Sequence, residues 1–80
     1  MEKSMKIVKK ASPENEIEIN FTYHIPKGNQ QEKYKSLRTK SKELAYIFNE
    51  LCPDSKEKEL AMVRLEEALM WANASIARHE

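Results

Sequence analysis

One stretch of this sequence combines an aromatic ring with a cluster of positive charges. Tyr23 is followed closely by Lys27, Arg38 and Lys40. An aromatic side chain stacks well on a nucleobase, and lysine and arginine bind phosphate groups. These residue types favour an anionic ligand that also carries flat rings. The simpler interpretation is that the ring of Tyr23 covers apolar neighbours and that the charges form a solvated face.

The charges of the chain are segregated, although the net charge is only +1. Residues 27–42 contain six basic residues and one acidic residue, hence a net charge of +5. Residues 43–80 contain four basic and eight acidic residues, hence a net charge of −4. The two blocks indicate either complementary packing between subunits or an anion site. The near-neutral total argues against a dedicated binder of DNA or RNA polymers, which is normally strongly basic.

Residues for other chemistries are scarce. A single glycine in the chain excludes a P-loop or a GxGxxG motif. Cys52 is the one cysteine, and His24 and His79 lie far apart, so no spacing is typical of a zinc site. Cys52 before Pro53 is interpreted as a packed side chain rather than a nucleophile. We therefore expect no enzyme, no metal and no cofactor.

The size of the chain favours self-association. Eighty residues form one small domain that buries a limited fraction of its surface, and oligomerisation is a common remedy. No apolar run reaches membrane-spanning length, and no segment resembles a secretory signal. The sequence predicts a protein that stays in the cytoplasm and does not bind a membrane.

A first helix is predicted over about residues 30–51. Asn29 as N-cap and Glu32 three residues later form the pattern of a capping box. The helix is expected to end by Leu51, because Pro53 disfavours helical geometry at the residue before it. Apolar positions recur at intervals of three and four residues, with Ser41 on the same stripe: Tyr34, Leu37, Leu44, Ala45, Phe48 and Leu51.

A second helix is predicted over about residues 55–78. Asp54 is the expected N-cap, with Glu57 as the reciprocal capping-box residue. Only three residues, Cys52 to Asp54, separate the two helices. So short a connection predicts an antiparallel two-helix hairpin, and hence an all-α fold.

The segment before the hairpin has a different pattern. Residues 1–15 are polar and lysine-rich and are predicted to form a flexible N-terminal arm. From Glu16 to Tyr23, apolar and polar residues alternate, which is typical of an extended segment with one buried face. We expect either a short strand or, preferably, an extended arm laid over the helices. Residues 16–80 then form the hairpin domain.

The second helix is apolar on too many sides to be covered by one neighbour. Leu65, Leu69 and Ile76 share one side, whereas Leu60 and Trp71 lie on another. The helix is therefore expected to pack against other copies of the chain.

Three polar or aromatic residues on this second helix have two interpretations each. Trp71 is interpreted as an interface anchor, or as a ring edge presented to a ligand. Asn73 fixes the register of the oligomer or contacts a ligand. Arg78 complements the helix dipole, or clamps a ligand where symmetry brings several copies together.

The chain resembles a family of small phage proteins through two groups of motifs. The first runs through Phe21-Thr22-Tyr23-His24-Ile25-Pro26-Lys27 and includes Leu37-Arg38 and Cys52-Pro53-Asp54-Ser55. The second lies near the end of the chain: Leu65-Glu66-Glu67-Ala68, Met70-Trp71-Ala72-Asn73-Ala74 and Ile76-Ala77-Arg78. Over about residues 21–79, this pattern is similar to the anti-CBASS cyclic-oligonucleotide sponges, which share a hairpin domain with anti-Thoeris sponges.

The resemblance implies a binding function without catalysis. Such sponges hold cyclic oligonucleotide immune signals uncleaved in the cytoplasm of the infected bacterial host, so that the defence effector stays inactive. The resemblance further implies a homohexamer, with cyclic dinucleotides such as cGAMP held between subunits and, in some members, cyclic trinucleotides held on threefold axes. By position it implies Tyr23, Lys27, Arg38 and Lys40 for the dinucleotide site, and Thr39 and Arg78 for the trinucleotide site.

Three alternatives remain open on the sequence. The first is a sponge for cyclic ADP-ribose-type signals, which shares the fold. The second is an oligomeric helical adaptor that binds a host protein through its acidic helix face. The third is a weak nucleic-acid binder that uses residues 27–42, which predicts steep salt dependence and little preference for cyclic ligands.

Overall fold

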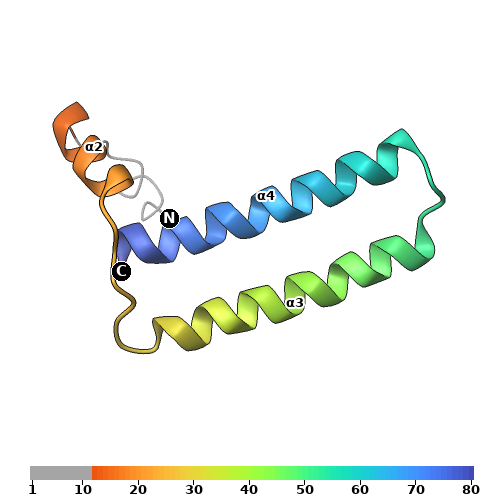
Figure 1. The fold of residues 1–80 in the computed structure, drawn as a ribbon, viewed down its shortest axis with the longest axis horizontal. Coiled ribbons are helices and arrows are strands. Elements are labelled where there is room, and N and C mark those ends of the chain that lie inside the picture. The colour runs from red at the N-terminus through yellow and green to blue at the C-terminus, as the bar shows by residue number, and fades with distance from the viewer. Residues whose placement is uncertain (1–11) are drawn as a thin grey trace, which may run out of the picture.

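The computed structural model describes residues 12–80 and contains three helices in that range: α2 (Pro13–Phe21), α3 (Gln30–Leu51) and α4 (Lys56–His79). Helices α3 and α4 run antiparallel as one long hairpin, and α2 lies at its open end beside the C-terminal end of α4 (Figure 1). The predicted all-α hairpin is confirmed, and the described residues contain no strand.

Helix α3 turns one stripe of side chains towards α4. Half-buried residues recur at helical spacing along it: Tyr34, Leu37, Ser41, Ala45 and Phe48. The helix ends at Leu51, where the Cys52 N–H still donates to the Phe48 carbonyl at 3.0 Å. Cys52 itself is extended, with φ −98° and ψ 132°, as expected for a residue before proline.

Helix α4 begins with a different cap from the one predicted. The N-cap is Ser55, whose Oγ accepts a hydrogen bond from the Lys58 N–H at 3.0 Å. The same hydroxyl donates to the Pro53 carbonyl at 3.1 Å. The prediction of Asp54 as N-cap is wrong, because its carboxylate instead pairs with the Lys58 ammonium at 3.1 Å.

The predicted capping box at the start of α3 is also wrong. Asn29 occupies the N-cap position, but its side chain makes no capping hydrogen bond. Its φ of −95° and ψ of 21° lie outside the extended region that side-chain caps normally adopt. Glu32 still lies in the first turn, where its charge suits the positive end of the helix dipole.

The alternating segment from Glu16 to Tyr23 is mostly helical, so the predicted strand or extended arm is wrong over residues 16–21. Ser12 caps α2 by accepting from the Asn15 N–H at 3.2 Å, and Pro13 occupies its first turn. The N-cap serine and the proline favour a helix start, and here they outweigh the alternation of apolar and polar residues. Because residues two apart on a helix do not share a face, the alternating apolar side chains form no continuous apolar face on α2. Ile17 remains 56% exposed and Phe21 83% exposed. The prediction of a flexible N-terminal arm over residues 1–15 is wrong for residues 13–15, which belong to α2. Residues 1–11 of that arm lie outside the described residues.

The seam between α3 and α4 is shallow. No hydrophobic side chain among residues 12–80 is buried. Several large apolar side chains are at least partly open to solvent along the hairpin: Leu44, Tyr46, Ile47, Leu51, Leu60, Val63, Met70 and Trp71. The hairpin therefore leaves much of its apolar surface uncovered by its own residues.

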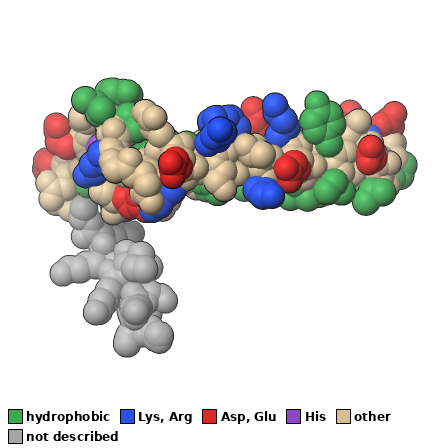
Figure 2. Space-filling model, turned by 90° about the horizontal axis from the view of Figure 1, so that it is seen from below, with side chains coloured by type: hydrophobic (Ala, Val, Ile, Leu, Met, Phe, Trp, Pro, Cys, Tyr) green, Lys and Arg blue, Asp and Glu red, His purple; other side chains and the backbone are tan. Residues whose placement is uncertain are grey.

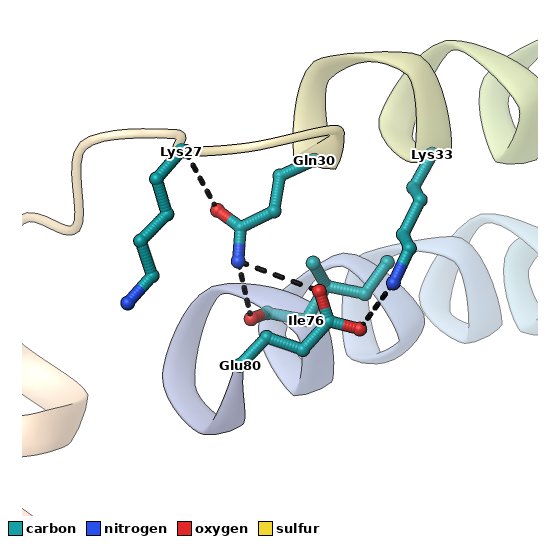
Figure 3. A network of polar contacts seen from close by, with 5 residues as sticks. All are labelled: Lys27, Gln30, Lys33, Ile76 and Glu80. Atoms are coloured by element: carbon teal, nitrogen blue, oxygen red, sulfur yellow. Dashed lines mark hydrogen bonds and ion pairs between the residues drawn. The ribbon is translucent and has the colours of Figure 1, made fainter.

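An ion pair closes the open end of the hairpin. The Lys33 ammonium on α3 donates to the Glu80 carboxylate at the end of α4 (Figure 3). This bond, together with a hydrogen bond from Gln30, lowers the pKa of Glu80 from its ordinary value. Because the folded pKa is depressed, this contribution to stability is present above the ordinary pKa of a glutamate and is lost as the pH falls through the folded value.

The cap assignment at α4 predicts unequal effects for two neighbouring substitutions. Ser55→Ala removes the bond to the Lys58 N–H, so we expect a loss of about 1 kcal/mol in the free energy of unfolding. Asp54→Ala removes only a solvent-exposed ion pair and is expected to cost less than about 0.5 kcal/mol. Urea unfolding followed by circular dichroism, at one fixed protein concentration, measures both. A larger loss for Asp54→Ala contradicts the assignment.

The pairing of Lys33 with Glu80 predicts a specific titration. In the wild-type protein, the Glu80 carboxyl should titrate below its ordinary pKa, and Lys33→Met should move its midpoint upward. Lys35→Met removes a charge from the same helix without touching Glu80, so it should leave the midpoint close to the wild-type one. Carbon-13 NMR of the Glu80 side chain gives all three midpoints. An unchanged midpoint in Lys33→Met contradicts the pairing.

Candidate functional site

The connection between α2 and α3 carries the first two predicted site residues. Tyr23 is 80% exposed, and Lys27 is exposed as well. The imidazole Nε2 of His24, which lies between them in sequence, donates to the Ile19 carbonyl at 2.7 Å and folds the connection back onto α2. The solvent-exposed ring of Tyr23 and the exposed Lys27 side chain therefore lie four residues apart on one short segment.

A tight turn places Lys27 directly before α3. The Gln30 N–H donates to the Lys27 carbonyl at 3.0 Å across Gly28 and Asn29. Gly28 has a φ of +58°, which side chains other than glycine rarely adopt, and Asn29 has a φ of −95°. These φ values match a type II′ turn, in which glycine is preferred at the first central position. The positive φ at position 28 therefore favours glycine, which is the single glycine of the chain.

Gln30 is the buried polar residue of this region, with 4% of its surface exposed. Its Oε1 accepts from the Lys27 N–H at 3.0 Å. Its Nε2 donates to the Ile76 carbonyl and to the Glu80 carboxylate, both at 3.5 Å. Figure 3 shows these contacts joining the connection, the start of α3 and the end of α4, with the Lys27 side chain running beside Gln30 and taking no part in the dashed contacts. After Lys33 and Gln30, the Lys27 charge also contributes to the lowered pKa of Glu80.

Three further predicted site residues are consecutive on α3. Arg38, Thr39 and Lys40 are all exposed. Successive helical residues are rotated by about 100°, so Arg38 and Lys40 point to different sides of the helix. The Lys40 ammonium lies 3.6 Å from the Glu43 carboxylate, on the side away from Arg38. Figure 2 shows basic side chains gathered over the middle of the hairpin, with hydrophobic ones towards its far end.

Arg38 borders a series of shallow hollows along one face of the hairpin. One hollow is lined by Arg38 together with apolar residues of both helices, including Ala45, Met62 and Leu69. A second lies nearer the open end, where Arg38 and Tyr34 face Met70, Asn73, Ala74 and Ala77 of α4. A guanidinium at the edge of an apolar hollow can hold a phosphate while the hollow accepts a flat ring.

Asn73 differs from the other polar residues of this face. Its side-chain Oδ1 is buried and has no hydrogen-bond partner among the described residues. A buried amide oxygen without a partner costs free energy, so native proteins nearly always provide a donor. Asn73 lines the second hollow, so this hollow contains a polar side chain whose buried oxygen is left unsatisfied by the hairpin.

Trp71 and Arg78 lie together on the opposite flank of α4. The guanidinium carbon of Arg78 is 6.0 Å from the centroid of the Trp71 ring, a cation–π distance. Trp71 is 62% exposed, so the pair forms an open platform rather than part of a core. Such a platform offers a flat ring and a positive charge to whatever packs against it.

Within one chain, the structure brings some predicted residues together and separates others. Tyr23 and Lys27 share one connection, and Trp71 contacts Arg78. Lys40 lies apart from Arg38, as described above. Gln30 was not predicted, although it had a signal: it extends the apolar stripe of α3 by one helical turn before Tyr34, so it faces α4.

Residues 12–80 hold no group of three acidic, histidine or cysteine side chains arranged to bind a metal ion. Cys52 is a free, half-buried thiol. None of the three helices is long and apolar enough to cross a membrane. The site residues described above carry aromatic rings, amides and cationic groups.

Comparison with known proteins gives one match. The chain matches the family described as "Acb2/Tad1, hairpin domain" over residues 13–77. Searches of curated proteins and of solved structures returned no match. The matched range includes all three described helices, apart from the last two residues of α4. The chain therefore belongs to the Acb2/Tad1 hairpin-domain family, the anti-CBASS and anti-Thoeris sponges that bind cyclic nucleotide signals.

Proposed function

We propose that this protein captures cyclic di- and trinucleotide immune signals and holds them uncleaved, so that a CBASS effector in the cytoplasm of the infected bacterial host is not activated. The observation that carries the proposal is the family match, because it covers nearly all of the proposed contact residues. Only Arg78 lies beyond the matched range, by one residue.

The connection before α3 supports the dinucleotide part of the proposal. A cyclic dinucleotide presents two flat bases and two phosphates. Tyr23 offers an open ring for a base, and the Lys27 ammonium stands four residues away, outside every ion pair found among the described residues. Stacking on an aromatic ring contributes roughly 1–3 kcal/mol per base, and a charge-assisted bond to phosphate roughly 1.5–3 kcal/mol.

Arg38 and Lys40 are proposed to complete this site from different copies of the chain. They point to different sides of α3, so a single hairpin does not turn both towards one ligand. In the proposed homohexamer, apolar faces of neighbouring hairpins meet, and the Tyr23 connection of one copy is proposed to lie beside α3 of another. The exposed apolar side chains along α3 and α4 supply the surface for that assembly.

Thr39 and Arg78 are proposed to contact cyclic trinucleotides. Thr39 is exposed in the middle of α3, and Arg78 is half-buried in the last turn of α4. Three symmetry-related Arg78 side chains on a threefold axis match the three phosphates of such a ligand. Trp71 is proposed to anchor the assembly around that axis, and the unpartnered Asn73 Oδ1 to fix its register.

Isothermal titration with a panel of cyclic di- and trinucleotides tests the function directly. We expect tight binding, with a Kd in the nanomolar range or about −12 kcal/mol, because a sponge must outcompete the effector for a scarce signal. The ligand released after denaturation should be chemically intact. Binding of cyclic ADP-ribose isomers alone supports the anti-Thoeris alternative, and degraded ligand contradicts sequestration.

A matched pair of tyrosine substitutions tests the stacking contact. Tyr23→Ala is expected to weaken cyclic-dinucleotide binding by roughly tenfold or more, because it removes one base-stacking surface. Tyr23→Phe keeps the stacking ring and removes only the hydroxyl, so it should leave the affinity within about twofold. Equal affinities for Tyr23→Ala and wild type rule out the stacking role.

The assembly is tested by its mass. Light scattering after size-exclusion chromatography should give six chains for the wild type. Trp71→Ala removes a large, exposed aromatic side chain from the proposed interface and should lower that mass or make it depend on concentration. A stable hexamer in Trp71→Ala contradicts its role as an anchor.

A further inference from the structure

We propose that Gln30 is a positioning residue of the ligand site and acts through Lys27. This inference rests on the proposed function, since it assigns Lys27 to a ligand phosphate. Gln30 reaches no solvent-facing ligand itself, because only 4% of its surface is exposed. Its role is to hold the backbone from which the Lys27 ammonium extends.

Both backbone polar groups of Lys27 are bound by the same residue. The Lys27 carbonyl accepts from the Gln30 N–H, and the Lys27 N–H donates to Gln30 Oε1, each at 3.0 Å. The first bond belongs to the turn and is available to any residue at position 30 except proline. The second needs a side chain with an acceptor that reaches back three residues. Together they leave the Lys27 backbone little freedom to rotate.

The amide nitrogen of Gln30 ties this clamp to the far end of the chain. It donates to the Ile76 carbonyl in the last turns of α4 and to the Glu80 carboxylate. If Gln30 bonded only to the turn, the connection and the Gln30 side chain could move together relative to the hairpin. Because Gln30 also bonds to α4, the connection keeps a fixed orientation on the hairpin (Figure 3).

These contacts differ from those of an ordinary helix cap. A capping side chain accepts from the second or third N–H of its own helix, as Ser12 and Ser55 do here. Gln30 accepts from a residue that precedes α3, so its acceptor orders the connection rather than the helix. The Lys27 side chain starts from that ordered backbone, and its ammonium group makes none of the contacts drawn in Figure 3.

Positioning matters because flexible lysines bind weakly. A lysine side chain has high rotational freedom, and an unrestrained backbone adds to the entropy that a ligand must suppress. Fixing the backbone in advance removes part of that cost, which is the general advantage of a preorganised site. Loss of the Gln30 side-chain bonds should therefore weaken phosphate binding without removing any ligand contact.

A double-mutant cycle in the full-length protein tests this role. Gln30→Met keeps a side chain of similar length and removes its hydrogen bonds. Gln31→Met makes the same change at the adjacent, exposed glutamine and serves as the control. For a cyclic dinucleotide such as cGAMP, we expect Lys27→Ala to weaken binding by roughly tenfold or more, and Gln30→Met by about five- to tenfold. The double variant should bind within about twofold of Lys27→Ala alone, because Gln30 acts through Lys27.

Amide hydrogen exchange provides a readout that does not depend on the ligand. Exchange of the Lys27 N–H should accelerate by about tenfold or more in Gln30→Met and stay near the wild-type rate in Gln31→Met. Gln30→Glu combined with Glu80→Gln keeps the oxygen that accepts from Lys27 and places an amide, rather than a second carboxylate, at position 80, so this exchanged pair should retain slow exchange. It also provides a folded comparison if Gln30→Met does not fold.

The outcomes separate this proposal from the proposed function. If the wild type binds but the losses in the double variant are additive, the positioning role is overturned and the sponge function stands. Unchanged Lys27 exchange in Gln30→Met, or rapid exchange in the variant that combines Gln30→Glu with Glu80→Gln, also overturns the positioning role. If the wild-type protein binds no cyclic dinucleotide, both proposals fall together.

Discussion

Two helices side by side cannot enclose a core, and the rest of this structure follows from that constraint. Each helix has one partner, so every apolar side chain outside the α3–α4 seam faces solvent in a single chain. Even the side chains in the seam are only half-buried, since no hydrophobic side chain among residues 12–80 is buried. Another surface against α4 would stabilise a fold on this plan, and in the proposed homohexamer a second copy of the chain supplies it with the same uncovered apolar groups.

The same constraint decides where a ligand can bind. A single hairpin has no interior to hold a nucleotide, and its hollows are open grooves between α3 and α4. Binding groups must then lie at the edges, on the connection before α3 and along the outer faces of the helices. Tyr23, Lys27 and Arg38 occupy such places. A capture protein gains from this plan, because sites formed between copies bury the ligand from several sides at once.

The hairpin could be predicted from the sequence because its signals agree with one another. Apolar spacing, the short link and Pro53 all point to the same two helices. The missed features are those where local signals compete. The alternation before Tyr23 suggests an extended segment, yet Ser12 and Pro13 start a helix. Asp54 and Ser55 are both good caps by residue type, and only backbone geometry selects Ser55. Tyr23 and Lys27 are predicted as ligand contacts from residue type and from the family resemblance. The backbone of Lys27 is held by Gln30, which residue type does not reveal.

Gln30 and Asn73 both place a side-chain amide on an apolar stripe of a helix, but only the amide of Gln30 has hydrogen-bond partners at both its oxygen and its nitrogen within the hairpin. Both are polar residues on helix faces that pack. Gln30 satisfies both ends of its amide inside the hairpin. Asn73 leaves its buried Oδ1 without a donor among the described residues. An unsatisfied buried acceptor costs roughly 1–3 kcal/mol, a large share of the stability of a small domain. The amide of Gln30 therefore contributes to the fold of one chain. The unsatisfied acceptor of Asn73 adds nothing to that fold, which agrees with its proposed role in the assembly.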